Sequence, residues 1–396
     1  MPWKDTRPAA QDPTRRFESP PDTAVLQRLH DAHCHPTDDD AFSRFELEQL
    51  HTGVLCAMSS SLSNQAKTRE IYRECRDRVI PCFGVHPWFS HPISFEPRTS
   101  LPSREDHYRS VFSIPNRDAL DGADAESNPA SSSAAALDRL LPYFPDPVSI
   151  EDVLSQLERD LSTTDSDRSM VGEIGIDKAF KIPHAPNLIA LDPTLPKNSD
   201  LQTPIAHQVK VVEAQLDAAI RLRKNVSFHS VRATQDTTEL LNRCKKDKAG
   251  FREIHVCLHS FGASPEAARQ VQRNHPNVFF SFSTIISDRS PQFHNLLRAI
   301  EPDRLLVESD FSDTSQIDLQ IWEVFEAICA ARAWTHDEAL STLERNWARY
   351  TQPFDERPPP KKSNKERKRE RKQVDLYVSD DEDAEGTRST NGSVPG

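Results

Sequence analysis

The chain has 396 residues, of which 36% are hydrophobic, and a formal net charge of −12. This length fits one large α/β domain with insertions or two ordinary domains. The negative charge disfavours a general nucleic-acid-binding surface, so any contact with nucleic acid should be local or carried by a metal. No apolar run approaches the roughly 18 residues that span a bilayer, and residues 1–17 lack the hydrophobic core of a signal peptide, so no membrane partner is expected.

The seven cysteines are an odd number without the spacing of a disulfide framework. Most lie in strand-like runs, as Cys56, Cys82 and Cys257 do. This pattern predicts reduced thiols of the kind found in intracellular proteins.

The first structured element is expected near residue 24, because residues 1–23 are rich in Pro, Arg and Asp and are predicted to be disordered. Residues 24–30 are predicted to form a short strand that leads into the motif DAHCH. In an extended segment alternate side chains share a face, so Asp31, His33 and His35 should point the same way. Two imidazoles on one face can clamp a metal ion, although solvated or hydrogen-bonded histidine pairs are also common.

Beyond this motif, predicted helices alternate with short, continuously apolar strands, the pattern of a parallel sheet. The expected helices include 41–51, 64–77, 149–161 and 205–223, and the further strands are 53–58, 78–87, 168–177, 225–229, 253–259, 278–283 and 304–308. Eight strands in one α/β domain, 24–352, predict a (β/α)8 TIM barrel. A doubly wound open sheet is the alternative, but it favours a Gly-rich first turn, and the turn here is DAHCHPTD.

Two stretches interrupt the alternation. Residues 91–148 are rich in Pro, Ser, Asp and Ala and are predicted to be a largely disordered surface insertion whose removal costs little stability. Residues 181–204 are a second, Pro-rich insertion loop.

The C-terminal segment 353–396 is predicted to be a disordered charged tail. Its basic run, 361–372, holds eight Lys or Arg residues and adjoins the acidic stretch 379–383. Such a run is typical of a nuclear-import signal or of an arm that contacts nucleic acid, and the acidic neighbour weakens the second interpretation more. The import signal predicts a distribution between nucleus and cytoplasm; the remaining alternative is solvated charge without a receptor.

In such a barrel, catalysis takes place at the C-terminal ends of the strands. Six metal-ligand side chains are predicted at this rim, each of which alone could be structural: His33, His35, Glu173, His229, His259 and Asp310. Four imidazoles and two carboxylates suit two divalent ions, such as Zn²⁺ or Mn²⁺, better than one.

Six motifs in this order resemble those of the TatD family of metal-dependent deoxyribonucleases: DAHCH, GVHP, GEIGID, VSFHS, HSFGAS and ESD. The resemblance covers residues 28–350 apart from the two insertions, and it implies a TIM barrel of the metallo-dependent hydrolase type. It implies that the metal ligands are the six rim residues just named and that the cofactor is a pair of divalent ions (Zn, Mn or Mg).

The resemblance also implies a role for each ligand. His33 and His35 would hold one ion, and His229 and His259 the other or an intermediate position. Glu173 would bridge the two ions. Asp310 would ligate one ion and act as general base, so that Glu173 and Asp310 are the predicted catalytic residues.

Substrate contacts are assigned to His86 and Arg232. His86 is expected either to contact a phosphate or to fix the His-Pro turn by a hydrogen bond. The family usually has Arg two residues after the strand-five histidine, whereas this chain has Val231 there and Arg232 next. The family's cysteine after the strand-six histidine is Ser260 here.

Two further acidic residues are expected to be structural. Asp177 should cap the following loop, and Glu308 should orient a neighbouring histidine.

The leading hypothesis is a metal-dependent hydrolase of phosphodiester bonds, a 3′-end DNA exonuclease by resemblance. A second hypothesis is an interaction protein, because fungal members of the family are associated with the anaphase-promoting complex, a cell-cycle ubiquitin ligase. A hydrolase of C–N bonds is disfavoured, since its two-metal members often bridge with a carboxylated lysine and strand four offers Glu173.

Overall fold

The computed structural model describes residues 21–38, 44–114, 129–164, 166–287 and 292–353. Residues 1–20 and 354–396, including the basic run 361–372, lie outside these ranges. Their predicted disorder, and the predicted nuclear and cytoplasmic distribution, therefore stay predictions.

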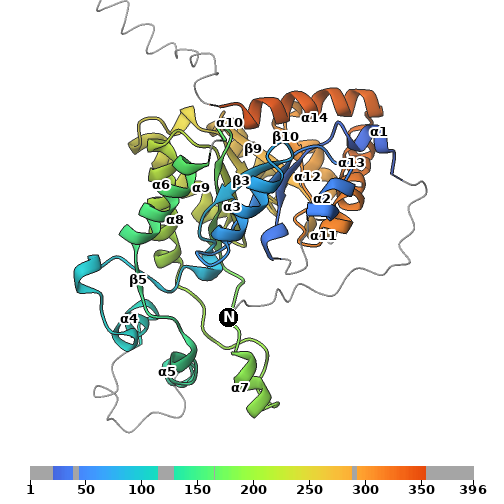
Figure 1. The fold of residues 1–396 in the computed structure, drawn as a ribbon. Coiled ribbons are helices and arrows are strands. Elements are labelled where there is room, and N and C mark those ends of the chain that lie inside the picture. Colours follow the sequence, from blue (N-terminus) through green and yellow to red (C-terminus); the bar gives the residue numbers. More distant parts are fainter. Residues whose placement is uncertain (1–20, 39–43, 115–128, 165, 288–291, 354–396) are drawn as a thin grey trace, which may run out of the picture. The chain divides into compact units, whose positions relative to one another are not determined.

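Eight parallel strands form one sheet in the order β1-β2-β3-β6-β7-β8-β9-β10 (Figure 1). The strands are β1 (Asp31–Cys34), β2 (Leu55–Met58), β3 (Val79–Phe83), β6 (Met170–Asp177), β7 (Val226–Val231), β8 (Val256–Leu258), β9 (Val278–Phe282) and β10 (Leu305–Val307). This order confirms the predicted (β/α)8 barrel.

Hydrogen bonds between the first strand and the segment after the last strand bring the barrel nearly to closure. The Asp310 N–H donates to the His33 carbonyl at 2.9 Å, and the His35 N–H donates to the Phe311 carbonyl at 2.8 Å. The buried Asp31 carboxylate accepts from the Ser309 backbone N–H at 3.0 Å. Closure therefore places the end of the last strand beside the DAHCH motif.

Alternation along the strands separates two apolar cores. In β8, β9 and β10 the second residue of each strand (Cys257, Phe279 and Leu306) faces the barrel interior, and its neighbours pack under the surrounding helices. Trp347 and Tyr350 of α14 (His336–Thr351) join the interior cluster. The Tyr350 hydroxyl donates to the Val226 carbonyl at the start of β7. This end of the barrel is thus filled with side chains, and the polar site lies at the other.

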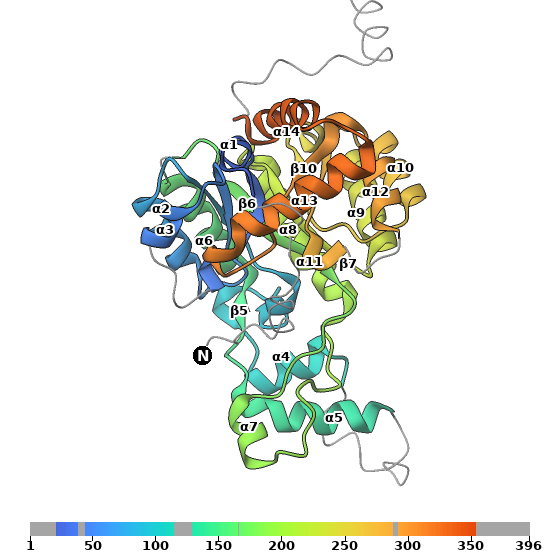
Figure 2. The ribbon, with the colours of Figure 1, turned by 90° about the vertical axis from the view of Figure 1, so that its right-hand side faces the viewer.

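The barrel helices follow the strands they cover (Figures 1 and 2). They are α2 (Arg44–Gln49), α3 (Gln65–Glu74), α6 (Ile150–Thr163), α8 (Ile205–Arg221), α9 (Thr234–Asp247), α10 (Pro265–Asn274), α11 (Thr284–Ser287), α12 (Phe293–Ala299) and α13 (Ile317–Arg332). No helix in the described ranges is long and apolar enough to cross a membrane. All seven cysteines are buried free thiols.

The prediction of a strand over 24–30 is wrong. A short helix, α1 (Thr23–Leu26), occupies this segment, and the strand begins only at Asp31. The Asp22 carboxylate caps the helix by accepting the Ala24 N–H at 2.9 Å. The buried Val25, Leu26 and Leu29 follow a helical spacing, but the apolar composition of so short a segment also fits a strand.

The expectation of a largely disordered first insertion is also wrong for its described residues. It contains α4 (Arg104–Val111) and α5 (Pro129–Leu140), and its ends meet where β4 (Ile93–Ser94) pairs with β5 (Val148–Ser149). The second insertion contains α7 (Pro186–Leu191). Composition was misleading here because the Ser- and Ala-rich run is a good helix former with Pro at its first position.

The two insertions share one apolar cluster (Figure 2). Tyr108, Leu137 and Phe144 from the first insertion pack with Ile182 and Leu201 from the second. We call the described residues 91–114, 129–148 and 181–204 the insertion lobe. Its shared core explains why neither insertion should be dispensable on its own.

We therefore expect Leu137→Ala, at a fully buried position in α5, to destabilise the lobe by about 2–5 kcal/mol. Hydrogen exchange of α4 and α5 should rise while exchange of the barrel strands stays slow. Leu191→Ala in α7 is the matched control, because Leu191 is 80% exposed. Equal exchange in the two variants would contradict the shared core.

Candidate metal centre

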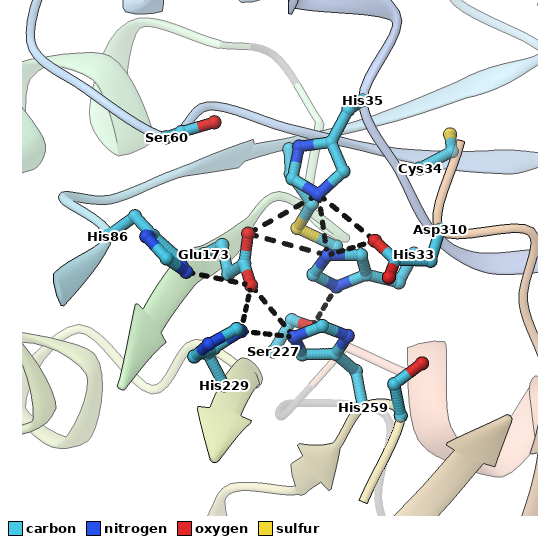
Figure 3. Close-up of polar contacts among 12 residues, drawn as sticks. His33, Cys34, His35, Ser60, His86, Glu173, Ser227, His229, His259 and Asp310 are labelled. Carbon is cyan, nitrogen blue, oxygen red and sulfur yellow. Dashed lines mark hydrogen bonds and ion pairs between the residues drawn. The ribbon is translucent and has the colours of Figure 1, made fainter. Parts of the chain in front are cut away.

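Glu173 lies in the middle of a cluster of histidines at the C-terminal ends of the strands (Figure 3). Its side chain projects from β6 and is buried. One carboxylate oxygen, Oε2, lies 3.3 Å from His35 Nε2 and 3.5 Å from His33 Nε2. This oxygen faces the two histidines of the DAHCH motif.

The other carboxylate oxygen of Glu173 faces a second group. Oε1 lies 2.7 Å from His259 Nε2, 2.8 Å from His229 Nδ1 and 3.3 Å from His86 Nε2. These histidines come from the ends of β8, β7 and β3. A single carboxylate thus stands between two sets of imidazoles, as a bridging ligand would.

Asp310 adds a second carboxylate to the first group. Its Oδ1 lies 3.4 Å from His35 Nε2 and 3.9 Å from His33 Nε2. Asp310 has a left-handed backbone with φ of 50°. L-residues with side chains adopt this conformation rarely, and such residues cluster at functional sites.

The residues fit divalent metal ions by the chemistry of their donor atoms. His33 Nε2 and His35 Nε2 are 3.0 Å apart, and His229 Nδ1 and His259 Nε2 are 3.1 Å apart. When both imidazoles of such a pair are neutral, nitrogens this close can direct their lone pairs at one shared point. Three groups have ligand atoms within 4.8 Å of one another: His33, His35 and Glu173; His33, His259 and Asp310; and His86, Glu173 and His229.

The cluster's electrostatics keep Glu173 ionised. Burial would raise its pKa, but the nearby His86, His259 and His33 lower it well below the usual value. Burial would lower the pKa of His229, but hydrogen bonds to Asp177 and Glu173 raise it to about 9. The pKa of His259 is likewise raised against burial by Glu173, whereas burial lowers the pKa of His33 to about 4.

We expect metal binding at pH 7 to release protons, because His229 and His259 are protonated without metal and must be neutral to ligate. Since the raised pKa of His229 lies above 7, the apparent affinity should strengthen with rising pH, about tenfold per pH unit for each proton displaced. Calorimetry in buffers of different ionisation enthalpy measures the release. Binding enthalpies equal across buffers would contradict it.

Neighbouring polar groups hold the histidines in place. Asp177 Oδ2 lies 3.3 Å from His229 Nε2, and Asp177 Oδ1 accepts the Ala179 and Phe180 N–H groups, so the predicted loop cap also orients a histidine. Glu308 Oε1 lies 3.7 Å from His259 Nδ1, within ion-pair range but beyond a hydrogen bond, so its orienting role stays a prediction.

The altered residue Ser260 supports Glu308. Its backbone N–H donates to Glu308 Oε1 at 2.8 Å, and its hydroxyl donates to the same oxygen. A serine in place of the family's cysteine therefore helps to fix the carboxylate behind His259.

The sequence interpretation missed two supporting residues. Ser227 Oγ lies 2.7 Å from His33 Nδ1, and Asp38 Oδ2 lies 3.5 Å from His35 Nδ1. Ser227 could have been found, because it precedes His229 by two residues on the same face of β7.

Gly175 lets two site strands approach closely. A Cβ at this position would overlap the His229 carbonyl. Any side chain there would push β7, and the imidazole that β7 carries, away from Glu173.

The structure brings all six predicted ligands together, and His86 with them. His86 fulfils the turn-fixing interpretation, because its Nδ1 accepts the Trp88 N–H at 3.2 Å while Nε2 faces Glu173. Arg232 is exposed directly after β7 and makes no hydrogen bond or ion pair with any other described residue. Its predicted substrate contact stays a prediction.

A (β/α)8 barrel with a His- and carboxylate-lined rim defines a metal-dependent hydrolase. The TatD related DNase family model matches residues 30–352, so the chain belongs to this family of hydrolases that act on ester bonds.

Two fungal relatives span nearly the same length. Cut9-interacting protein scn1 of Schizosaccharomyces pombe is 27% identical, with 81% of this chain and 98% of that protein covered. Uncharacterized deoxyribonuclease YMR262W of Saccharomyces cerevisiae is 24% identical, with 81% and 96% covered.

Among solved structures, the TatD homologue YJJV of Escherichia coli K12 matches with a TM-score of 0.53 at 18% identity. It covers 82% of this chain and 98% of its own. At this identity the likeness concerns the fold.

Proposed function

We propose that the chain hydrolyses phosphodiester bonds of DNA from the 3′ end, using two divalent ions held at the rim. The observation that carries this proposal is that the two oxygens of Glu173 face two different groups of imidazoles. A single ion would need only one of these two groups of histidines. The presence of both therefore favours two ions. The name of the Saccharomyces cerevisiae relative, a deoxyribonuclease, agrees with DNA as substrate.

Each residue of the metal centre has a separate proposed role in hydrolysis. Divalent ions bound here would activate water and neutralise charge that develops on the phosphate. His33, His35 and Asp310 would hold one ion, and His229 and His259 the other, with Glu173 between them. Asp310 would take the proton from the attacking water, because its carboxylate lies beside His35 in the first group of ligands. His86 and Arg232 are the proposed phosphate contacts.

The experiment is elemental analysis of gently purified protein, followed by assays on 5′- and 3′-labelled oligonucleotides. We expect about two divalent ions per chain and stepwise loss of nucleotides from the 3′ end. Less than about a tenth of an equivalent, with no gain from added Mn²⁺, Mg²⁺ or Zn²⁺, would contradict the two-ion site. Metal-loaded protein that leaves DNA and RNA intact would contradict the nuclease proposal, and cleavage of RNA alone would reassign the substrate.

A second candidate function is binding to a subunit of the anaphase-promoting complex. The observation that favours it is the name of the Schizosaccharomyces pombe relative, which describes interaction with Cut9. A pull-down with purified Cut9 of Schizosaccharomyces pombe tests this second function. The unmodified chain and the Glu173→Ala variant serve as baits in parallel. Equal capture by both proteins would separate partner binding from hydrolysis, and capture by neither would contradict this function.

A further inference from the structure

Two aromatic side chains stack beside the metal centre and take no part in the ligand cluster. The rings of Trp88 and Phe180 have centroids 4.7 Å apart and planes inclined by 15°. Trp88 follows β3 and Phe180 follows β6, so both stand at the C-terminal rim. Both are partly exposed, whereas Glu173 is buried.

Trp88 is fixed to two residues of the site. Its indole N–H donates to Asp177 Oδ2 at 2.6 Å, and its backbone N–H donates to His86 Nδ1 at 3.2 Å. Its ring meets the edge of the His86 ring with centroids 4.8 Å apart, and its centroid lies 6.5 Å from that of His229. The indole therefore lies directly beside the ligand cluster.

Phe180 is fixed by the same carboxylate. Asp177 Oδ1 accepts the Phe180 N–H at 3.0 Å. Asp177 thus sets the positions of Trp88, Phe180 and His229 at once. These hydrogen bonds fix the position of the stacked pair relative to the metal centre. Two rings that only packed in an apolar core would not need them.

A fixed, partly exposed aromatic surface beside a phosphodiester site suits a nucleobase. Every base has a π-face, and stacking on aromatic side chains is a general means of holding single nucleotides. Lys178, two residues before Phe180, is paired with Asp236 at 2.5 Å. Its positive charge is therefore already balanced by a carboxylate of the protein. In a chain of net charge −12, stacking can supply affinity that electrostatics does not.

We propose that the Trp88–Phe180 pair is a nucleobase-binding subsite that seats the base next to the scissile phosphate. The inference rests on the proposed function, since it assumes a nucleic acid substrate. It adds a recognition element that the metal ligands would not provide, because their donor atoms would be taken up by the ions.

The competing explanation is that the pair clamps the insertion lobe onto the barrel. The first insertion begins three residues after Trp88 and the second directly after Phe180, and Phe180 packs against the lobe cluster. A clamp predicts that loss of either ring loosens the lobe. A subsite predicts loss of base-dependent binding with an intact lobe.

The test compares a 5′-labelled dT12 with the same oligonucleotide carrying abasic residues at its three 3′ positions. Fluorescence anisotropy in EDTA gives both dissociation constants without hydrolysis. For the unmodified protein we expect about tenfold tighter binding of the base-bearing strand. Phe180→Leu should abolish this preference, and Phe180→Tyr should keep it. Phe112→Leu is the matched control, because Phe112 also packs against the lobe cluster.

Four outcomes separate the possibilities. Unchanged preference in Phe180→Leu, with DNA cleavage intact, would overturn the subsite and leave the nuclease proposal standing. Lost preference accompanied by fast hydrogen exchange of α4 and α5 would assign the pair to the clamp. If EDTA abolishes binding, the ratio of KM values for the two strands in Mn²⁺ decides, and a ratio near one overturns the subsite. Protein that neither binds nor cleaves DNA fails the proposed function itself.

Discussion

Glu173→Ala is expected to remove bound metal and hydrolysis together. The substitution deletes the one carboxylate whose two oxygens face both groups of histidines. Without it, His229 and His259 lose the negative charge that balances them in their buried positions. We expect the metal content to fall from about two ions to less than one and hydrolysis to fall by at least about a thousandfold.

The matched control is another buried carboxylate outside the site. Asp160 in α6 is 2% exposed and pairs with Arg69 at 2.5 Å. Asp160→Ala should lower the thermal midpoint without changing metal content measured by elemental analysis. Full metal loading of Glu173→Ala would refute the bridging position assigned to Glu173.

The fold was predictable because its strongest signals are local and repeated. Short apolar strands alternate with amphipathic helices through the whole barrel, and every barrel strand after the first overlaps its expected range. The error at residues 24–30 arose where a four-residue helix and a strand share the same apolar composition. There the Asp22 cap, rather than apolar content, distinguishes the two.

The insertion lobe was not predictable from composition. Pro, Ser and Ala content indicated disorder, but Tyr108, Leu137 and Phe144 find partners in an insertion that follows in sequence only after β6. No local window contains both halves of that core. Long-range pairing of this kind is visible only in three dimensions.

The ligand set was predictable because parallel strands bring their C-terminal ends to one rim. The geometry was not: nothing in the motifs says which oxygen of Glu173 faces which histidine. The aromatic pair could not be predicted from the sequence for a similar reason. Trp88 and Phe180 are 92 residues apart in sequence, and only the fold brings their rings into contact and places Asp177 against both.

Asp310→Asn is expected to keep the fold and lose hydrolysis by about 10²–10⁴-fold. The amide has nearly the same shape, and the backbone N–H that donates to the His33 carbonyl is unchanged. One oxygen remains to face His35, so metal content should fall by at most one ion. The amide nitrogen cannot accept a proton, and general-base catalysis is therefore what the variant lacks.

The control is Asp313→Asn, three residues further along the same loop. Asp313 Oδ1 accepts the Ser315 N–H at 3.0 Å in an exposed turn, and none of its contacts involves the ligand cluster. It should cleave at the unmodified rate. The pH profile adds a second measure, because the acidic limb of kcat should disappear in Asp310→Asn if that carboxylate is the base. Cleavage by Asp310→Asn at the unmodified rate would remove Asp310 from the reaction. A lost rate with an unchanged acidic limb would leave it a ligand only.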